Sequence, residues 1–361
     1  MDLNRRDFGK LALAAAAAPA GTLLAEKPNS KFGGVQIGTI TYSYRGEPGV
    51  NDAAQLLKMV VDSGISAIEL MPPDAEACAG APQPAGRGGG GGGRGGSGGR
   101  GGRGGSGGFG PGGPGGMGMG MGMGGRGGSG ARGGGGGGRG MMSPEQQAAA
   151  EELKKWRLSA SMDKFKEFRK MYNDAGVSIY CHKLMPTDGM SDDEFDYFFT
   201  VAKTLGANSI TTELAPASDY TKKLGDFAHK HGLVCAYHAH EQATITAWDA
   251  VLAQSPGNAV NIDCGHYYAG TGISPIPALE KLHDRIASAH LKDRTPSVPG
   301  KSGLNLPWGQ GSTPIVEILQ TAKKNKWKFP FAVELEYQVP EGSNAVIEVK
   351  KCVEYCRKAL A

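Results

Sequence analysis

The strongest limit on the fold of this chain is a repeated alternation of short apolar segments with longer amphipathic ones. The short segments are rich in β-branched and apolar residues, which is typical of buried strands. Eight such segments occur, and the predicted strands are Val35–Tyr42, Ser66–Met71, Val177–Leu184, Ser209–Leu214, Leu233–His240, Ala259–Asp263, Ile286–Leu291 and Pro330–Tyr337.

The longer segments place apolar residues at helical spacing, so a helix is predicted after each strand. The predicted helices are Asp52–Ser63, Ser161–Ala175, Asp192–Leu205, Tyr220–His231, Ala247–Gln254, Pro277–Asp284, Thr313–Asn325 and Ser343–Leu360. One helix after every strand is the pattern of a parallel sheet, and eight such units form a closed (β/α)8 barrel of about 250 residues. We therefore predict an α/β fold, a TIM barrel over residues 33–361.

A tract rich in glycine and arginine interrupts this pattern after the second predicted strand. Between Gly86 and Gly140, 37 of 55 residues are glycine and 7 are arginine, with no acidic residue. Glycine at this density buries too little apolar surface to offset chain entropy. We expect residues 79–142 to be a disordered insertion that leaves the barrel on the face where barrel active sites lie.

The N-terminus has the features of an export signal. Arg5 and Arg6 form a twin-arginine pair, and a stretch rich in Ala and Leu follows from Leu11 to Ala20. We expect residues 1–25 to be a twin-arginine signal peptide, with the Tat export machinery as a partner and a periplasmic or exported protein as the result. No apolar run reaches the roughly 20 residues of a membrane span, so no stable span is expected.

The charge distribution excludes a chain that is basic throughout. The formal net charge is +4, and because the glycine-rich tract holds seven arginines and no acid, the other residues sum to −3. A dedicated nucleic-acid binder would be basic throughout. The six cysteines form no CxxC pair, and Cys181, Cys235 and Cys264 lie in apolar runs, where free core cysteine is the usual state.

Acidic and histidine side chains gather at the carboxyl ends of the predicted strands. In a parallel barrel these ends meet at one mouth, where active sites lie. Converging carboxylates and imidazoles are suitable ligands for one divalent ion, such as Mn²⁺, Mg²⁺, Co²⁺ or Zn²⁺. The residues at these strand ends are Glu69, His182, Glu213, His238, His240, Asp263, His266, His290, Lys292, Glu334 and Glu336.

Motifs on the last strands resemble those of a known superfamily. They are Asn261-Ile-Asp263-Cys-Gly-His266, Ala289-His290-Leu-Lys292-Asp293 and Val333-Glu334-Leu-Glu336. In this order they resemble the xylose-isomerase-like TIM-barrel superfamily, which includes sugar phosphate isomerases, ketose 3-epimerases and inosose dehydratases. Tyr237-His238-Ala-His240-Glu241 resembles the fifth-strand motif of the inosose-dehydratase-like branch, and Pro307-Trp-Gly309-Gln-Gly311 resembles the glycine turn after strand seven.

The resemblance implies a metal site. The family holds its ion with an acid on strand five, an Asp on strand six, a His on strand seven and a Glu on strand eight. Asp263, His290 and Glu334 match three of these ligands. Where epimerases have the strand-five Glu, this chain has His238. Our preferred fourth ligand is Glu213, at the end of the fourth strand, and His238 itself is the alternative.

The implied chemistry takes place at a sugar carbonyl. The ion polarises the carbonyl and stabilises the enediolate that forms when an α-proton leaves. The candidate catalytic residues are Glu336, His266, His238 and Lys292. The candidate substrate-binding residues are His240, His182 and Glu69. The expected function is a divalent-metal-dependent isomerase or epimerase that acts on a sugar or keto-sugar.

Other functions share part of this pattern. The same enediolate could lose a β-substituent, which would make the protein a lyase or dehydratase acting on a keto-sugar or 3-keto-glycoside. The His238/His240 pair favours this alternative, because the leaving oxygen needs an acid. A sugar-binding barrel without activity and an RNA-binding protein that uses the arginine–glycine tract are less favoured. The tract offers only Phe109 for base stacking, and no nucleic-acid partner is expected.

Overall fold

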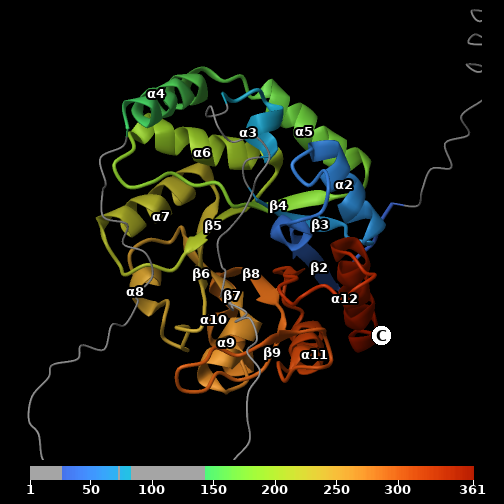
Figure 1. Cartoon of the computed structure of the whole chain (residues 1–361). Helices are drawn as coiled ribbons and strands as arrows, with labels where there is room; N and C mark the ends of the chain where they lie inside the picture. Colours follow the sequence, from blue (N-terminus) through green and yellow to red (C-terminus); the bar gives the residue numbers. More distant parts are fainter. Residues whose placement is uncertain (1–26, 72–73, 83–142) are drawn as a thin grey trace, which may run out of the picture. The chain divides into compact units, whose positions relative to one another are not determined.

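Figure 1 shows the computed structural model of the chain, which describes residues 27–71, 74–82 and 143–361. The predicted signal peptide, residues 1–25, lies outside the described residues. The predicted insertion, residues 79–142, lies outside them from residue 83 onward. Residues 143–150 are grouped with the unit Pro84–Ala150 and form the start of α4 (Pro144–Ser159). The barrel belongs to the other unit, Met1–Gln83 with Glu151–Ala361.

Eight parallel strands of the described residues close into a barrel. Each strand is hydrogen-bonded to the next one, and the last pairs with the first. The strands are β2 (Val35–Ile40), β3 (Ala67–Leu70), β4 (Ser178–His182), β5 (Ser209–Glu213), β6 (Val234–Ala239), β7 (Asn258–Asp263), β8 (Ile286–Leu291) and β11 (Phe331–Val333). The predicted α/β TIM barrel is therefore confirmed.

The helices of this unit lie around the strands (Figure 1). They are α2 (Ala53–Asp62), α3 (Asp74–Cys78), α5 (Asp163–Asp174), α6 (Asp192–Leu205), α7 (Asp219–His231), α8 (Asp249–Leu252), α9 (Cys264–Thr271), α10 (Ile276–Leu282), α11 (Ile315–Asn325) and α12 (Ala345–Ala359). Local sequence fixes their ends: α6 begins with a capping box between Ser191 and Glu194 and stops at Gly206, whose φ is 89°. Among the described helices, none is long and apolar enough to cross a membrane.

Shorter elements extend this frame. β1 (Lys31–Phe32) pairs antiparallel with β2. The chain also forms two short 3₁₀ helices among the described residues, η1 (Thr41–Tyr44) and η2 (His283–Arg285). β9 (Asp293–Arg294) and β10 (Asn305–Leu306) form a hairpin directly after β8. The carboxylate of Asp293 accepts hydrogen bonds from the backbone N–H groups of Gly309 and Gly311, and so it folds the glycine turn that follows.

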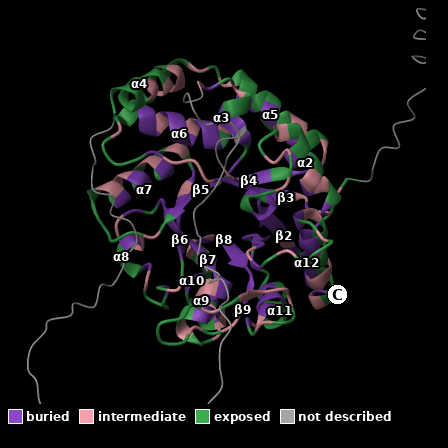
Figure 2. Cartoon of the chain, viewed as in Figure 1, coloured by how far each residue is buried: buried purple, intermediate pink, exposed green. Residues whose placement is uncertain are grey.

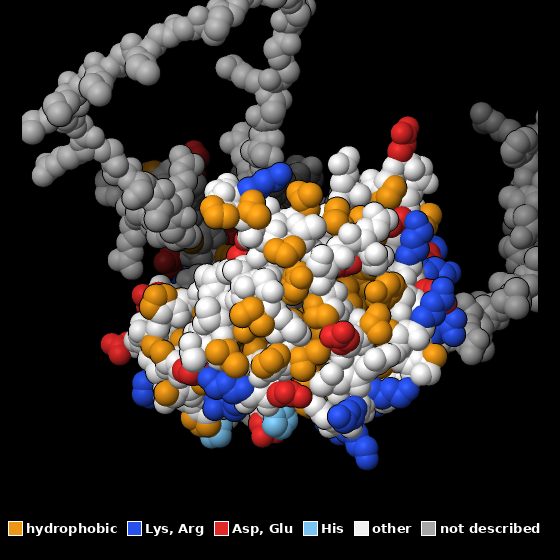
Figure 3. Space-filling view, turned by 90° about the horizontal axis from the view of Figure 1, so that it is seen from below, with side chains coloured by type: hydrophobic (Ala, Val, Ile, Leu, Met, Phe, Trp, Pro, Cys, Tyr) orange, Lys and Arg blue, Asp and Glu red, His pale blue; other side chains and the backbone are white. Residues whose placement is uncertain are grey.

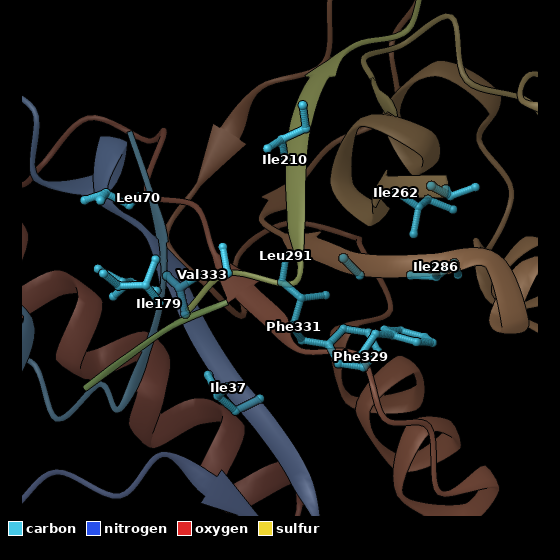
Figure 4. Packing of buried hydrophobic residues seen from close by; sticks show 14 of the residues in the cluster. Ile37, Leu70, Ile179, Ile210, Ile262, Ile286, Leu291, Phe329, Phe331 and Val333 are labelled. Atoms are coloured by element: carbon cyan, nitrogen blue, oxygen red, sulfur yellow. The ribbon is translucent and has the colours of Figure 1, made fainter. Parts of the chain in front are cut away.

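Alternate residues of the strands serve different purposes. Ile210, Ile262 and Leu291 belong to the buried hydrophobic cluster, part of which Figure 4 shows. The polar residues that alternate with them form hydrogen bonds between strands. For example, the hydroxyl of Thr211 on β5 donates to Glu69 on β3 at 2.7 Å. Both kinds of residue are buried, and Figure 2 shows the strands coloured as buried along most of their length. This alternation is the expected result of the two-residue period of a strand.

Two of the differences from the prediction lie at the candidate site. β11 ends at Val333, so Glu334 and Glu336 follow the strand instead of lying in it. The chain leaves the ladder there because the N–H of Leu335 donates to the Ser43 hydroxyl. The helix α9 was not predicted, since its residues show no amphipathic pattern; it begins where Asp263 accepts a hydrogen bond from the N–H of His266.

The distribution of charge on one face of the molecule is relevant to nucleic-acid binding. On the face in Figure 3, Lys and Arg side chains stand in separate groups near the edge, and apolar and uncharged side chains fill most of the centre. That face has no continuous basic surface of the kind that holds a nucleic-acid backbone.

Candidate metal centre

The structure brings four buried side chains together at the carboxyl ends of neighbouring barrel strands. One potential ligand atom from each lies within 4.8 Å of the others, and the residues are His238, Asp263, His290 and Glu334. Each is at most 7% exposed. The register of β7 and β8 sets Asp263 beside His290, so the grouping follows from strand pairing. The three ligands that the resemblance implies are close enough to hold one ion.

His290 is held between two carboxylates. Its Nε2 donates to Glu69 Oε2 and its Nδ1 donates to Glu334 Oε2, each at 2.8 Å. Burial would lower the pKa of this imidazole, but the negative charges of Glu69 and Glu334 outweigh burial and raise the pKa to about 10. Glu69 is fully buried. Because Nε2 is committed to Glu69, Nδ1 is the nitrogen that faces the other candidate ligands.

His238 is oriented by an amide. Its Nδ1 donates to Asn261 Oδ1 at 2.8 Å, since an amide oxygen can only accept. The other nitrogen, Nε2, therefore keeps the lone pair that a metal ligand needs. The amide of Asn261 is fixed in turn, because Nδ2 donates to Ser288 Oγ at 2.7 Å. Burial and the nearby charge of His290 lower the pKa of His238 to about 4, so the ring is neutral at pH 7.

Replacement of Asn261 with leucine is expected to weaken metal binding about 10- to 100-fold, the usual effect of removing a group that orients a histidine ligand. The change removes the acceptor for His238 Nδ1 and lets the ring rotate. Isothermal titration with Mn²⁺ measures the loss. The control is Ser288→Ala, which removes a partner of Asn261 but keeps the His238–Asn261 hydrogen bond. An equal loss in both variants would contradict the prediction.

A buried lysine accompanies the carboxylates. Lys292 is 2% exposed, and its Nζ lies 2.9 Å from Asp263 Oδ2, 2.9 Å from Glu334 Oε2 and 2.7 Å from Glu336 Oε2. Burial would raise the pKa of Asp263 and of Glu334, but the charge of Lys292 lowers both below their usual range. Both carboxylates are therefore ionised, as metal ligands must be.

The donor set fits a divalent ion. Two imidazole nitrogens with two carboxylate oxygens suit Zn²⁺, Mn²⁺ and Co²⁺, and the carboxylates also suit Mg²⁺. Asp263 Oδ2 is buried, and its partner within the described residues is the ammonium of Lys292 at 2.9 Å. The other three members of the group also offer a nitrogen or oxygen atom at this point, so the residues present fit one divalent cation.

A second group, His238, His240 and His266, also has potential ligand atoms within 4.8 Å of one another. Its chemistry does not fit another ion. Arg294 Nη1 donates to His266 Nδ1 at 2.6 Å, so the neutral ring carries its proton on Nε2. Burial lowers the pKa of His266 to about 3, which keeps the ring neutral. His266 is therefore a hydrogen-bond donor through Nε2 and offers no free lone pair.

Comparison with known families agrees with this geometry. Residues 140–355 match a family described as the xylose isomerase-like TIM barrel. The matched range is more than half of the chain and includes all four residues of the candidate metal centre. The chain belongs to the xylose isomerase-like TIM barrel family.

Several solved structures are similar to this family member. A sugar phosphate isomerase/epimerase from Parabacteroides distasonis is 15% identical, with a TM-score of 0.52 over 91% of this chain and 96% of that one. The probable 3-DHS dehydratase AsbF from Bacillus anthracis is 13% identical, with a TM-score of 0.50 over 89% and 98%. A D-allulose 3-epimerase from Methylomonas sp. is 12% identical, with a TM-score of 0.50 over 90% and 98%. No curated protein matches the chain. At these identities the likeness shows the fold.

Glu213, the preferred fourth ligand, lies apart from the candidate metal centre. Glu213 is 57% exposed at its side chain and contacts Lys183 at 3.3 Å and His240 at 3.4 Å. It stands outside the four-residue group, in which His238 takes its place. The physical reason is that Glu213 ends β5 and turns toward Lys183 and His240. His238 lies inside β6 and is 3% exposed.

Of the other residues predicted to bind substrate or to act in catalysis, some are buried below the candidate metal centre and others lie nearer the solvent. Glu69 lies behind His290 and orients it, so it does not reach the mouth. His182 is 1% exposed, and its Nδ1 has no partner within the described ranges. Nearer the solvent are His240, 55% exposed at its side chain, and Glu336, whose Oε2 lies 3.9 Å from His266 Nε2.

Three residues at the site were not assigned a role from the sequence. Lys183 follows β4 and bonds to Glu213, and its position at a strand end was a usable signal. Asn261 lies two residues before Asp263 on β7, so the period of a strand places it on the same side. Arg294 had no signal, because its contacts with His266 and with Glu241 at 2.7 Å depend on the hairpin after β8.

Proposed function

We propose that this protein is a divalent-metal-dependent isomerase or epimerase that acts on a sugar or keto-sugar. The observation that carries the proposal is the buried group of two histidines and two carboxylates at the mouth of a xylose isomerase-like barrel. The names of two similar structures, a sugar phosphate isomerase/epimerase and a D-allulose 3-epimerase, support this class of reaction.

In this proposal His238 Nε2, His290 Nδ1 and one oxygen each of Asp263 and Glu334 hold the ion. A bound divalent cation would polarise the carbonyl of the substrate and so make the neighbouring carbon acidic. Glu69 and Asn261 fix the two histidine rings through their second nitrogens. The geometry favours His238 over Glu213 as the fourth ligand.

The proton transfers fall to residues that surround this group. Glu336 is the proposed base, because its side chain is 22% exposed and stands between Lys292 and His266. A carboxylate there can take a proton from the carbon beside the carbonyl and return it to another position. The ammonium of Lys292 would lie beside the oxygens of the enediolate, and His266 would donate a hydrogen bond from Nε2 to a substrate hydroxyl.

Elimination is the second candidate, and the name of one similar structure, a probable 3-DHS dehydratase, suggests it. Loss of a β-substituent needs an acid at the leaving oxygen. The sequence offers the His238/His240 pair as the source of that acid. However, His238 donates a hydrogen bond from Nδ1 to Asn261, and its Nε2 faces the other candidate ligands. His240 alone remains for this role, so we favour isomerisation or epimerisation.

The test combines metal analysis with a panel of keto-sugars in D₂O. The purified protein is expected to contain about one divalent ion per chain, and its substrate is expected to gain deuterium at the carbon beside the carbonyl. Product analysis then separates the outcomes, since a rearranged or inverted sugar supports the proposal and a shortened or dehydrated product supports elimination. Sugar binding without deuterium uptake under any divalent metal would leave only a binding protein.

We also propose that the enzyme works outside the cytoplasm. The twin-arginine pair Arg5-Arg6 and the apolar stretch after it support export through the twin-arginine pathway. A fusion of residues 1–30 to a reporter that is active only after export tests this, with Arg5→Lys/Arg6→Lys as the control that should remain inside.

A further inference from the structure

The positive charge of Lys292 lies next to the place where the proposed metal would bind. Its Nζ is 2.9 Å from Asp263 Oδ2 and 2.9 Å from Glu334 Oε2, and both carboxylates belong to the four-residue metal group. A third carboxylate, Glu336, lies 2.7 Å from the same ammonium but is outside that group. The lysine therefore shares two of its three partners with the ion.

The side chain of Lys292 has little freedom to move away. A Cβ atom on Gly265 would lie 2.3 Å from Lys292 Cγ and 2.6 Å from the Lys292 carbonyl oxygen, so the start of α9 packs directly on this residue. The residue is 2% exposed. The stem of this lysine packs on α9 and its ammonium lies among three carboxylates, so contacts at both ends hold it at the site.

We propose that Lys292 is a built-in competitor of the metal and that Glu336 is the partner that retains the ammonium when the ion binds. The inference rests on the proposed function, because it concerns the same metal. Two cations that contact the same oxygen atoms repel each other strongly in a buried site. The third carboxylate offsets this repulsion, so the Lys292–Glu336 pair sets the affinity of the centre.

Two substitutions are expected to change metal affinity in opposite directions. Lys292→Met removes the competing charge and should tighten Mn²⁺ binding by about tenfold or more. Glu336→Gln removes the retaining partner, holds the ammonium more firmly against Asp263 and Glu334, and should weaken binding by about tenfold. Titration calorimetry on the full chain, stripped of metal beforehand, measures both dissociation constants.

Lys183→Met is the matched control. This lysine is also at the mouth, with a side chain 21% exposed, but its ion pair is with Glu213, outside the metal group. It should change the Mn²⁺ dissociation constant by less than about threefold, because its ion pair within the described residues is with a carboxylate outside the four-residue group. An effect as large as that of Lys292→Met would mean that any positive charge near the mouth acts in the same way, and it would overturn the inference.

The double variant Lys292→Met/Glu336→Gln tests whether the two residues act together. If Glu336 works by retaining the lysine, its loss should matter little once Lys292 is absent, and the cycle should be non-additive. Additive changes, or a Lys292→Met protein that binds Mn²⁺ no more tightly than the wild type, would overturn the inference. If Lys292→Met does not fold, the Glu336→Gln variant is tested alone. Mn²⁺ binding that is unchanged or tighter in this variant would then overturn the inference. A wild-type protein that binds no divalent ion would instead sink the proposed function.

Discussion

The His290→Ala variant is expected to lose its metal and its turnover. The substitution removes one ligand nitrogen, and Glu69 and Glu334 both lose the hydrogen bond that they accept from this ring. Bound metal should fall from about one ion per chain to a small fraction of that, and kcat/KM should fall about a thousandfold or more. Elemental analysis of the purified variant and deuterium exchange at the substrate carbon are the measurements.

Loss of folding has to be separated from loss of metal. Removing one partner of a buried ion pair costs about 3–5 kcal/mol, so the unfolding temperature of the variant must be recorded by circular dichroism at the assay temperature and above. His290→Gln keeps a polar side chain of similar size and serves as the milder variant. The exposed His229→Ala is the control and should behave as the wild type. Full metal occupancy in a folded His290→Ala protein would refute the ligand assignment.

Metal affinity should rise about tenfold for each pH unit between pH 7 and pH 9, because each ion must displace one proton. The proton is the one on His290 Nδ1, since the charges of Glu69 and Glu334 outweigh burial and raise the pKa of this ring to about 10. His238, with a pKa lowered to about 4, is already neutral in this range. The slope should flatten as the pH approaches 10.

Stability of the metal-stripped protein should show the opposite trend. The pKa of His290 is higher in the folded chain than the value of about 6.5 for an unfolded histidine. Its charge therefore stabilises the fold fully below about pH 6.5, and this contribution is lost as the pH rises toward 10.

For the predicted pH dependence of metal affinity, calorimetry in two buffers of different ionisation enthalpy counts the protons that are released when the metal binds. A dissociation constant independent of pH would show that Nδ1 is not the ligand.

The fold could be predicted because its signal is local and repeated. Each barrel strand, such as β5 or β8, is an apolar run whose length and composition can be recognised alone. Once the strands are parallel, their carboxyl ends must meet, which brought eleven candidate residues to one mouth. The resemblance to a family then singled out Asp263, His290 and Glu334, which the structure places together.

The rest of the site depends on contacts that are distant in sequence. Glu213 and His238 are direct register partners on β5 and β6, so their positions alone could not separate a ligand from its neighbour. The deciding facts are the hydrogen bond from His238 to Asn261 and the turn of Glu213 toward Lys183. Likewise, β11 is short because Ser43 captures the backbone at Leu335, a contact across 292 residues.

The four strands that lead to the candidate ligands are consecutive around the barrel, from β6 through β7 and β8 to β11. The glycine-rich segment joins the chain after β3, which belongs to the other arc. The arc from β6 to β11 thus carries all four candidate ligands and is here called the reactive arc, while Glu69 of β3 orients His290 from the other side. A designer who wishes to change which molecule this enzyme accepts should graft loops onto the arc from β2 to β5 and leave the reactive arc untouched.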